Sequence, residues 1–227
     1  MKQLKHIMIV ADGGRRYARR IGVSKKESYF KAAVKGEDVA KLILIKNKIP
    51  ELTIFAVSYA NITKRKSEEL ESLMKAVTKF MEDLLKDDQF IKGRIKVTIY
   101  GHRELIPKYC KEAITRIENK TRKFDKGRLN LLIAYSGMLD FENAIRKTQN
   151  KGKDLNFKNI LEQCSLKTPI DLFIRTGNGR RISDGPFYLL LYSEMYFIIP
   201  YVPEVNKSDI TNVIISYKRK RGTTFGV

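Results

Sequence analysis

Short apolar runs alternate with longer segments of helical periodicity along most of the chain. The short runs are rich in β-branched residues and lack apolar–polar alternation, which is typical of strands buried on both faces of a sheet. We predict strands at Ile7–Val10, Leu52–Ser58, Ile95–Tyr100, Leu129–Ala134, Ile170–Ile174 and Tyr196–Ile199. Helices are predicted at Tyr29–Lys46, Ser67–Lys86, Ile106–Thr121, Leu139–Thr148 and Pro186–Ser193.

This alternation predicts an α/β fold with a mostly parallel central sheet flanked by helices. The chain has 227 residues, 43% of them hydrophobic, so we expect one domain spanning residues 1–227. The segment Ser67–Lys86 is strongly amphipathic, and core packing explains it, as it does Tyr29–Lys46. The alternative is that both helices wall a hydrophobic tunnel. The candidates for its floor are Phe80, Met81, Leu84 and Phe90.

Two loops that combine glycine with arginine follow predicted strands. The first runs Asp12-Gly-Gly-Arg-Arg16-Tyr17, and the second runs Arg175-Thr-Gly-Asn-Gly-Arg-Arg181-Ile-Ser183. Parallel sheets bind ligands at the carboxyl ends of their strands, so we expect both loops to line one crevice. Arginine forks and free backbone N–H groups bind phosphates well. The crevice is therefore predicted to hold diphosphate groups.

Asp12 is the one acid of the first loop. A single carboxylate can hold Mg²⁺ when phosphates and water supply the other ligands, and the metal then neutralises a leaving diphosphate. The backbone N–H groups of Gly13, Gly14 and Arg15 are expected to cradle the same phosphates if a helix begins there. The alternative is that Asp12 only caps that helix.

The formal net charge of +20 favours anionic partners, although a Lys-rich bias of the whole proteome would give the same excess. A nucleic-acid-binding module is disfavoured because neither interleaved basic and aromatic residues nor a known binding motif is evident. Cys110 and Cys164 have no nearby cysteine partners, and no apolar run has the length of a membrane span. We expect a soluble, cytoplasmic protein. The segment 218–221 (Lys-Arg-Lys-Arg) either contacts anionic lipid or is a solvated tail.

Several segments, in order along the chain, carry a resemblance to one enzyme family. The strongest matches are Asp171–Ser183 and Leu191–Phe197, and weaker ones are His6–Ala18, Leu52–Arg65 and Tyr135–Asp140. Together they resemble the cis-prenyltransferases. The resemblance implies an enzyme that uses Mg²⁺ to transfer a prenyl group from an allylic diphosphate to isopentenyl diphosphate. It also implies a product with a cis double bond and a homodimer.

The resemblance assigns roles to residues of the two loops. Arg16 is similar to the family's arginine for the allylic diphosphate, within a loop that also contains Gly13, Gly14, Arg15 and Tyr17. Either Lys64 or Arg65 takes the place of a further arginine. By the same resemblance, the acceptor's diphosphate is bound by Arg175, Arg181 and Ser183.

Three more residues receive roles in this way. Ser58 and Asn61 stand where the family positions substrate and proton transfer, and a loop cap is an equal alternative for Ser58. Glu194 is implied either to complete the metal site or to order the arginines across a dimer. Its alternative is an ordinary surface glutamate.

The chain also departs from the family pattern. Glycine replaces asparagine at Gly14, tyrosine replaces tryptophan at Tyr17, and a histidine motif is lost around Tyr29. Ile62 replaces another tryptophan, and Gly179 replaces an acid between the arginines. The family's terminal Arg-x-Gly is at best echoed at residues 224–226 or displaced to 220–222.

Three interpretations therefore stay open. The first is a standard cis-elongating synthase, and the second is an atypical member that uses another acceptor, such as dimethylallyl diphosphate or an alcohol. The third is a non-catalytic subunit of a heteromeric enzyme, against which the intact Asp12, Arg175, Arg181 and Ser183 argue. Product length and the choice between homodimer and heteromer are not set by the sequence.

Overall fold

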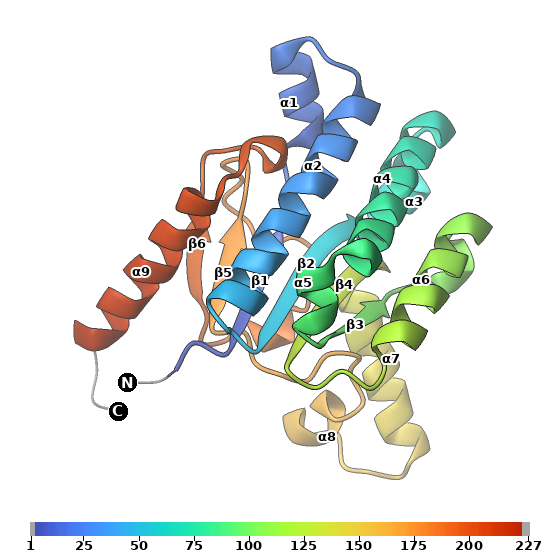
Figure 1. Ribbon diagram of the computed structural model, residues 1–227. Helices are drawn as coiled ribbons and strands as arrows, with labels where there is room; N and C mark the ends of the chain where they lie inside the picture. The colour runs from blue at the N-terminus through green and yellow to red at the C-terminus, as the bar shows by residue number, and fades with distance from the viewer. Residues whose placement is uncertain (1–2, 224–227) are drawn as a thin grey trace.

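The computed structural model describes residues 3–223, and its centre is a six-stranded sheet (Figure 1). The strand order is β3-β4-β2-β1-β5-β6, and every neighbouring pair is parallel. The strands are β1 His6–Val10, β2 Glu51–Ser58, β3 Ile95–Tyr100, β4 Gly127–Tyr135, β5 Leu172–Arg175 and β6 Glu194–Phe197. The predicted parallel sheet is confirmed, with each strand boundary within two residues of its predicted place.

Two layers of helices cover the sheet. The helices are α1 Gly14–Ile21, α2 Lys25–Ala40, α3 Tyr59–Lys64, α4 Ser67–Lys86, α5 Asp88–Lys92, α6 Lys108–Thr121, α7 Gly137–Asn150, α8 Phe157–Leu161 and α9 Lys207–Thr223. A π-helix, η1 Lys41–Lys46, continues α2. Three 3₁₀ turns complete the set, η2 Arg103–Leu105, η3 Phe187–Leu189 and η4 Val202–Glu204. In Figure 1, α2, α4, α6 and α9 lie over one face of the sheet, while α7 and α8 lie on the other side.

The strands are apolar throughout because each face has its own core. Along β1, Ile7 and Ile9 belong to the core under α2 and α4, whereas Met8 and Val10 belong to the core under α7. Successive side chains of a strand point to opposite faces, so a strand covered on both faces needs apolar residues at every position.

The predicted helices match the structure in some places and not in others. The predicted helix at Ser67–Lys86 is α4, with the same ends. The helix predicted from Tyr29 begins at Lys25, because the Ser24 side chain accepts a hydrogen bond from the Glu27 N–H. The helix predicted at Pro186–Ser193 is wrong, since only the 3₁₀ turn η3 forms. In η3 the Leu189 N–H donates to the Pro186 carbonyl and the Leu190 N–H to the Phe187 carbonyl, the i→i+3 pattern of a 3₁₀ turn.

A cavity of about 780 Å³ lies between α2, α4 and the sheet and reaches the carboxyl ends of β1, β2 and β5. Its apolar walls include Val39, Ile54, Val77, Phe80 and Leu131. These side chains fit the predicted tunnel. Of the four candidates for its floor, Phe80 lines the cavity, while the other three are buried in the core beyond it.

A buried polar cluster lies on the other face of the sheet. The imidazole of His6 is fully buried, with Nε2 2.8 Å from the Thr53 hydroxyl and Nδ1 3.0 Å and 3.2 Å from the carbonyls of Thr168 and Pro169. This arrangement suits a neutral ring that donates through Nδ1 and accepts through Nε2. Burial lowers the pKa of His6 below its ordinary value.

We expect this histidine to make folding stability depend on pH. Because the pKa of His6 is lower in the folded than in the unfolded state, its contribution is present above the unfolded pKa of about 6.5 and is lost as the pH falls below it. Denaturant unfolding between pH 8 and pH 5 measures the effect. His102 is the chain's other histidine, so His102→Gln is the matched control and should keep the pH dependence that His6→Gln loses. Equal pH dependence in the two variants would refute this assignment.

Candidate active site

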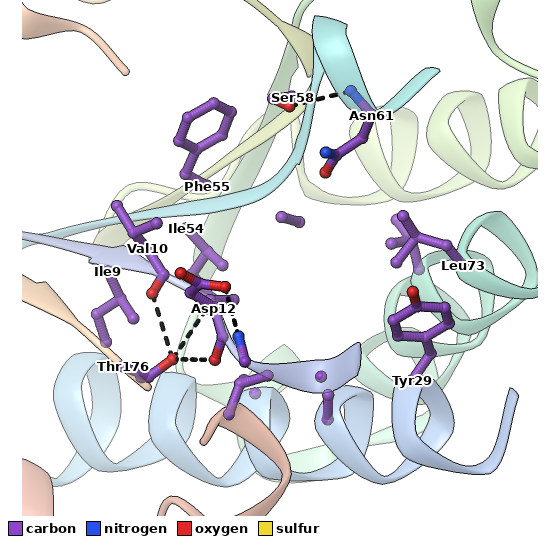
Figure 2. Close-up of a pocket in the computed structure, with 18 of the residues that line it drawn as sticks. Ile9, Val10, Asp12, Tyr29, Ile54, Phe55, Ser58, Asn61, Leu73 and Thr176 are labelled. Carbon is purple, nitrogen blue, oxygen red and sulfur yellow. Dashed lines mark hydrogen bonds between the residues drawn. The ribbon is translucent and has the colours of Figure 1, made fainter. Parts of the chain in front are cut away.

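The two glycine–arginine loops meet at the carboxyl ends of adjacent strands. The Asp12 backbone N–H donates to the Thr176 hydroxyl at 2.8 Å, and that hydroxyl lies 2.7 Å from the Asp12 carbonyl (Figure 2). Val10, the last residue of β1, pairs with Arg175 of β5. The parallel register therefore delivers both loops to one crevice, as predicted.

The Asp12 carboxylate is the centre of this crevice. Its Oδ2 lies 2.7 Å from Arg175 Nη2, 3.3 Å from Arg16 Nη2 and 3.8 Å from Arg181 Nη2. Its Oδ1 accepts the Gly13 N–H at 2.6 Å. Burial alone would raise the pKa of Asp12, but the hydrogen bond and charge of Arg175 outweigh it and hold the pKa below its ordinary value. Asp12 is therefore ionised at neutral pH.

Arg175 differs from the other arginines because its side chain is only 4% exposed. Its Nη1 donates to the Ser183 hydroxyl at 2.6 Å and to the Arg181 carbonyl at 2.8 Å. Ser183 has a φ of +59°, an uncommon conformation for a residue with a side chain. Arg175 thus holds the second loop in shape, while the side chain of Arg181 is 68% exposed and lines the cavity.

Helix α1 begins directly after Asp12, with Gly13 as its N-cap. The Gly13 φ of +100° is readily adopted only by glycine. No side chain caps the helix, so the N–H groups of its first turn lack intrahelical partners beside the cavity. Asp12 occupies only the Gly13 N–H, and the capping alternative therefore does not exhaust its role.

A second charged cluster surrounds Glu69, which the sequence did not single out. Its carboxylate is bonded to Lys25 and, at 2.9 Å, to the Tyr29 hydroxyl, and it lies 3.3 Å from Arg65 Nη1. Arg65 Nη1 also donates to the Tyr29 hydroxyl at 2.8 Å. Lys25, Tyr29 and Arg65 line the cavity, with Glu69 behind them. In the sequence, the four-residue spacing of Arg65 and Glu69 already indicates an ion pair between them.

Electrostatics keep the members of this cluster in fixed protonation states. Burial would raise the pKa of Glu69, but hydrogen bonds from Lys25 and Tyr29 and the charge of Arg65 lower it below its ordinary value. Burial raises the pKa of Tyr29 to about 12, against the opposing charge of Arg65. Tyr29 therefore stays protonated over the physiological range and acts as a hydrogen-bonding group.

Two departures from the family pattern contact each other here. A Cβ added at Gly14 would lie 3.2 Å from Tyr29 Cε1, a tight contact that a small shift of the ring would relieve. Gly14 and the Tyr29 ring therefore pack closely against each other beside the cavity.

The other predicted residues divide into those at the cavity and those away from it. The Ser58 hydroxyl accepts the Asn61 N–H at 3.1 Å, so Ser58 caps α3, and both residues line the cavity (Figure 2). Arg65 lines it too, whereas Lys64 is exposed and lies outside its lining. Tyr17 is buried away from the cavity, and its hydroxyl contacts Lys31 Nζ at 2.6 Å.

Glu194 lies away from Asp12 within one chain. It starts β6 and pairs with Leu172, at the amino end of β5, whereas Asp12 follows the carboxyl end of β1. The offset from Leu172 to Arg175 is three residues, roughly 10 Å along a strand. Within one chain, Glu194 therefore does not complete a metal site with Asp12.

Comparison with known proteins decides the family. The family model described as putative undecaprenyl diphosphate synthase matches residues 10–226. The chain belongs to the cis-prenyltransferases. A relative from Picrophilus torridus, a tritrans,polycis-undecaprenyl-diphosphate synthase (geranylgeranyl-diphosphate specific), is 35% identical over 95% of this chain and 88% of its own. An isoprenyl transferase from Campylobacter jejuni is 28% identical over the full length of both chains.

Solved structures show the same fold for this prenyltransferase. A probable undecaprenyl diphosphate synthase from Campylobacter jejuni matches with a TM-score of 0.80, 23% identity and 96% coverage of both chains. Lavandulyl diphosphate synthase from Lavandula x intermedia, solved with dimethylallyl diphosphate, matches with a TM-score of 0.86, 24% identity and 94% coverage of both chains. The family confirms that the protein is an enzyme of isoprenoid biosynthesis.

The Tyr29 hydroxyl yields a direct prediction. Tyr29→Phe removes the acceptor of Arg65 and the donor to Glu69, so we expect the KM of the allylic diphosphate to rise roughly three- to tenfold, as for the loss of one hydrogen bond worth about 1 kcal/mol. Because the pKa of Tyr29 is about 12, the pH profile below pH 10 should keep its shape. Steady-state kinetics from pH 6 to 10 measure both quantities, with Tyr59→Phe as the control. A new ionisation near neutral pH in Tyr29→Phe would contradict this account.

Proposed function

We propose that this prenyltransferase joins the prenyl group of an allylic diphosphate to isopentenyl diphosphate and forms a longer prenyl diphosphate with a cis double bond. The observation that carries the proposal is the cavity of about 780 Å³, which has an arginine-rich mouth and apolar walls. A diphosphate with a long hydrocarbon tail matches both surfaces. Relatives named geranylgeranyl-diphosphate specific support geranylgeranyl diphosphate as the allylic substrate.

The reaction sets clear demands on the residues. The bond between the allylic carbon and its diphosphate breaks, a carbon–carbon bond forms, and the acceptor loses a proton. Negative charge therefore grows on the leaving diphosphate, where Arg16 and the first N–H groups of α1 stabilise it. We assign Arg175, Arg181 and Ser183 to the diphosphate of the acceptor, and Arg65 to the allylic side.

The chemistry of the donor set fits Mg²⁺. Residues 3–223 contain no group of three or more His, Cys, Asp and Glu side chains able to hold a metal, and among them Asp12 and Asp184 are the carboxylates that line the cavity. Asp184 Oδ1 accepts the Met138 N–H at 3.0 Å, whereas Asp12 faces the arginines at the mouth. Mg²⁺ typically takes one or two carboxylates and completes its shell with phosphate and water. Bound there, Mg²⁺ would neutralise charge on the diphosphate. Because the pKa of Asp12 is lowered, Asp12 is a weak base, which supports metal binding over proton acceptance.

Ser58 and Asn61 are proposed to act on the acceptor side of the reaction. Figure 2 shows the Asn61 side chain directed toward the cavity from the start of α3, across from Tyr29. Its amide can hold the acceptor near the allylic carbon. Ser58 fixes Asn61 through the cap of α3.

We further propose a homodimer built on β6, the edge strand of the sheet. Large apolar side chains are exposed around this strand, with exposed fractions of 68% at Leu191, 84% at Tyr192, 41% at Met195 and 76% at Ile199. An edge strand with such neighbours is a template for pairing. A second copy there would let Glu194 act across the interface.

The proposed interface can be tested by sedimentation. Tyr192→Glu with Met195→Lys places opposite charges on the apolar patch, so we expect a monomer where the wild type is a dimer. Leu155→Glu alters an exposed leucine before α8 and should leave the dimer intact. A monomeric wild type, or a dimer that survives the double substitution, would contradict the proposal.

We also propose a single catalytic domain and a location for the protein. All described strands join one sheet, which supports a single catalytic domain over residues 1–227. None of the helices described is both long and apolar enough to traverse a bilayer. A cytoplasmic location and peripheral lipid contact stay predictions. Lys218 and Arg219 are exposed on α9, whereas the side chains of residues 220–223 and all of residues 224–227 lie outside the description.

The activity is tested with labelled isopentenyl diphosphate, geranylgeranyl diphosphate and Mg²⁺. We expect label in longer products, and a loss of roughly a hundredfold or more in Asp12→Ala, because an electrostatic group at the leaving diphosphate is removed. Asp154→Ala is the control, because Asp154 is exposed and does not line the cavity, and it should keep wild-type activity. If the allylic diphosphate is consumed only when dimethylallyl diphosphate or an alcohol is added, that compound is the acceptor and isopentenyl diphosphate is not. If no product forms with any acceptor, the result would favour a subunit that needs a partner protein for activity.

A further inference from the structure

Tyr201 lies between β6 and η4, and no motif draws attention to it. Its ring is a platform for two arginines: the guanidinium carbon of Arg16 is 5.2 Å from the ring centroid and that of Arg20 is 4.8 Å. Both distances fall within the range of cation–π attraction. Arg20 also forms an ion pair with Glu204, which serves as its counter-ion.

Both glycine–arginine loops approach this ring at a glycine. A Cβ added at Gly13 would lie 2.5 Å from Tyr201 Cδ1, and one added at Gly177 would lie 3.2 Å from the same atom. The first distance is shorter than any real contact, so the Gly13 backbone packs directly on the ring. Both loops thus come close to the ring at positions where a side chain would crowd it.

Backbone hydrogen bonds fix the segment around the ring. The Gly177 N–H donates to the Pro200 carbonyl at 2.7 Å, and the Val202 N–H donates to the Asp12 carbonyl at 3.0 Å. Tyr201 stands between these two anchors. Its ring therefore has a set position relative to Asp12 and to Arg16.

We propose that Tyr201 is a positioning residue that orients Arg16 toward the allylic diphosphate and limits its pairing with Asp12. Arg16 Nη2 is 3.3 Å from Asp12 Oδ2, longer than the 2.7 Å between Arg175 and the same oxygen. Attraction to the ring face competes with that pairing. Without the ring, Arg16 closes on Asp12 and takes up the carboxylate that the metal needs. This inference rests on the proposed function.

The ring face carries the effect, and the hydroxyl does not. Tyr201→Leu should raise the KM of the allylic diphosphate roughly three- to tenfold, the range of one cation–π contact, and leave the KM of isopentenyl diphosphate within about twofold. The conservative variant Tyr201→Phe keeps the ring and should restore the wild-type KM. A Tyr201→Phe variant as impaired as Tyr201→Leu would overturn the proposal.

Fluorination separates electrostatics from packing, because it weakens the ring's negative face with little change of shape. Phenylalanines with one, two and three ring fluorines at position 201 should raise the KM of the allylic diphosphate stepwise. In an Arg16→Met background, the same series should have no further effect, since its target is gone. A flat series in the wild type, or one that persists without Arg16, would contradict the role assigned to Tyr201.

Binding measurements keep this test independent of turnover. Calorimetry with Mg²⁺ and a non-reactive thio analogue of geranylgeranyl diphosphate should rank the fluorinated variants in the same order. If the variants bind the analogue in this order but the wild type forms no elongated product, the proposed acceptor is wrong and the role of Tyr201 stands. If product forms but the ranking is absent, the proposed function stands and the role of Tyr201 is wrong.

Discussion

The buried ion pair between Asp12 and Arg175 is the interaction on which the active site depends. A guanidinium cannot shed its proton in a protein, and the Arg175 side chain is only 4% exposed. Loss of its carboxylate partner would leave an uncompensated buried charge, at a cost of about 3–5 kcal/mol. The other edge of the same guanidinium holds Ser183 and the Arg181 carbonyl. One side chain therefore neutralises its charge on the first loop and shapes the second.

The parallel sheet makes this pair possible. Adjacent strands β1 and β5 end at the same edge, so loops more than 160 residues apart in sequence meet there. Nearby, Tyr29 fills the space left by Gly14, and Tyr17 contacts Lys31. The charge cluster of Asp12 with Arg16, Arg175 and Arg181 is complete beside these departures.

Much of this architecture follows from local patterns, and the remainder depends on tertiary contacts. The strands were predictable because burial on both faces demands apolar residues at every position, and the loops because glycine and arginine follow those strands. Helix α9 was missed, although Ile210, Val213, Ile214 and Tyr217 have helical spacing. The place of Glu194 at the amino end of β6 depends on the pairing of β6 with β5, which its own segment does not encode. The role of Tyr201 was not predictable from the sequence, since its contacts come from two loops that are distant along the chain.

A crystal structure with Mg²⁺ and the thio analogue of geranylgeranyl diphosphate tests the central claim most directly. The account predicts one metal ion bound to Asp12 as its only carboxylate ligand from the same chain, with diphosphate and water completing the shell. Arg175 should keep its contacts to Ser183 and the Arg181 carbonyl, while the Arg16 guanidinium contacts the diphosphate. A metal bound away from Asp12, or a diphosphate held without Arg16, would contradict the account.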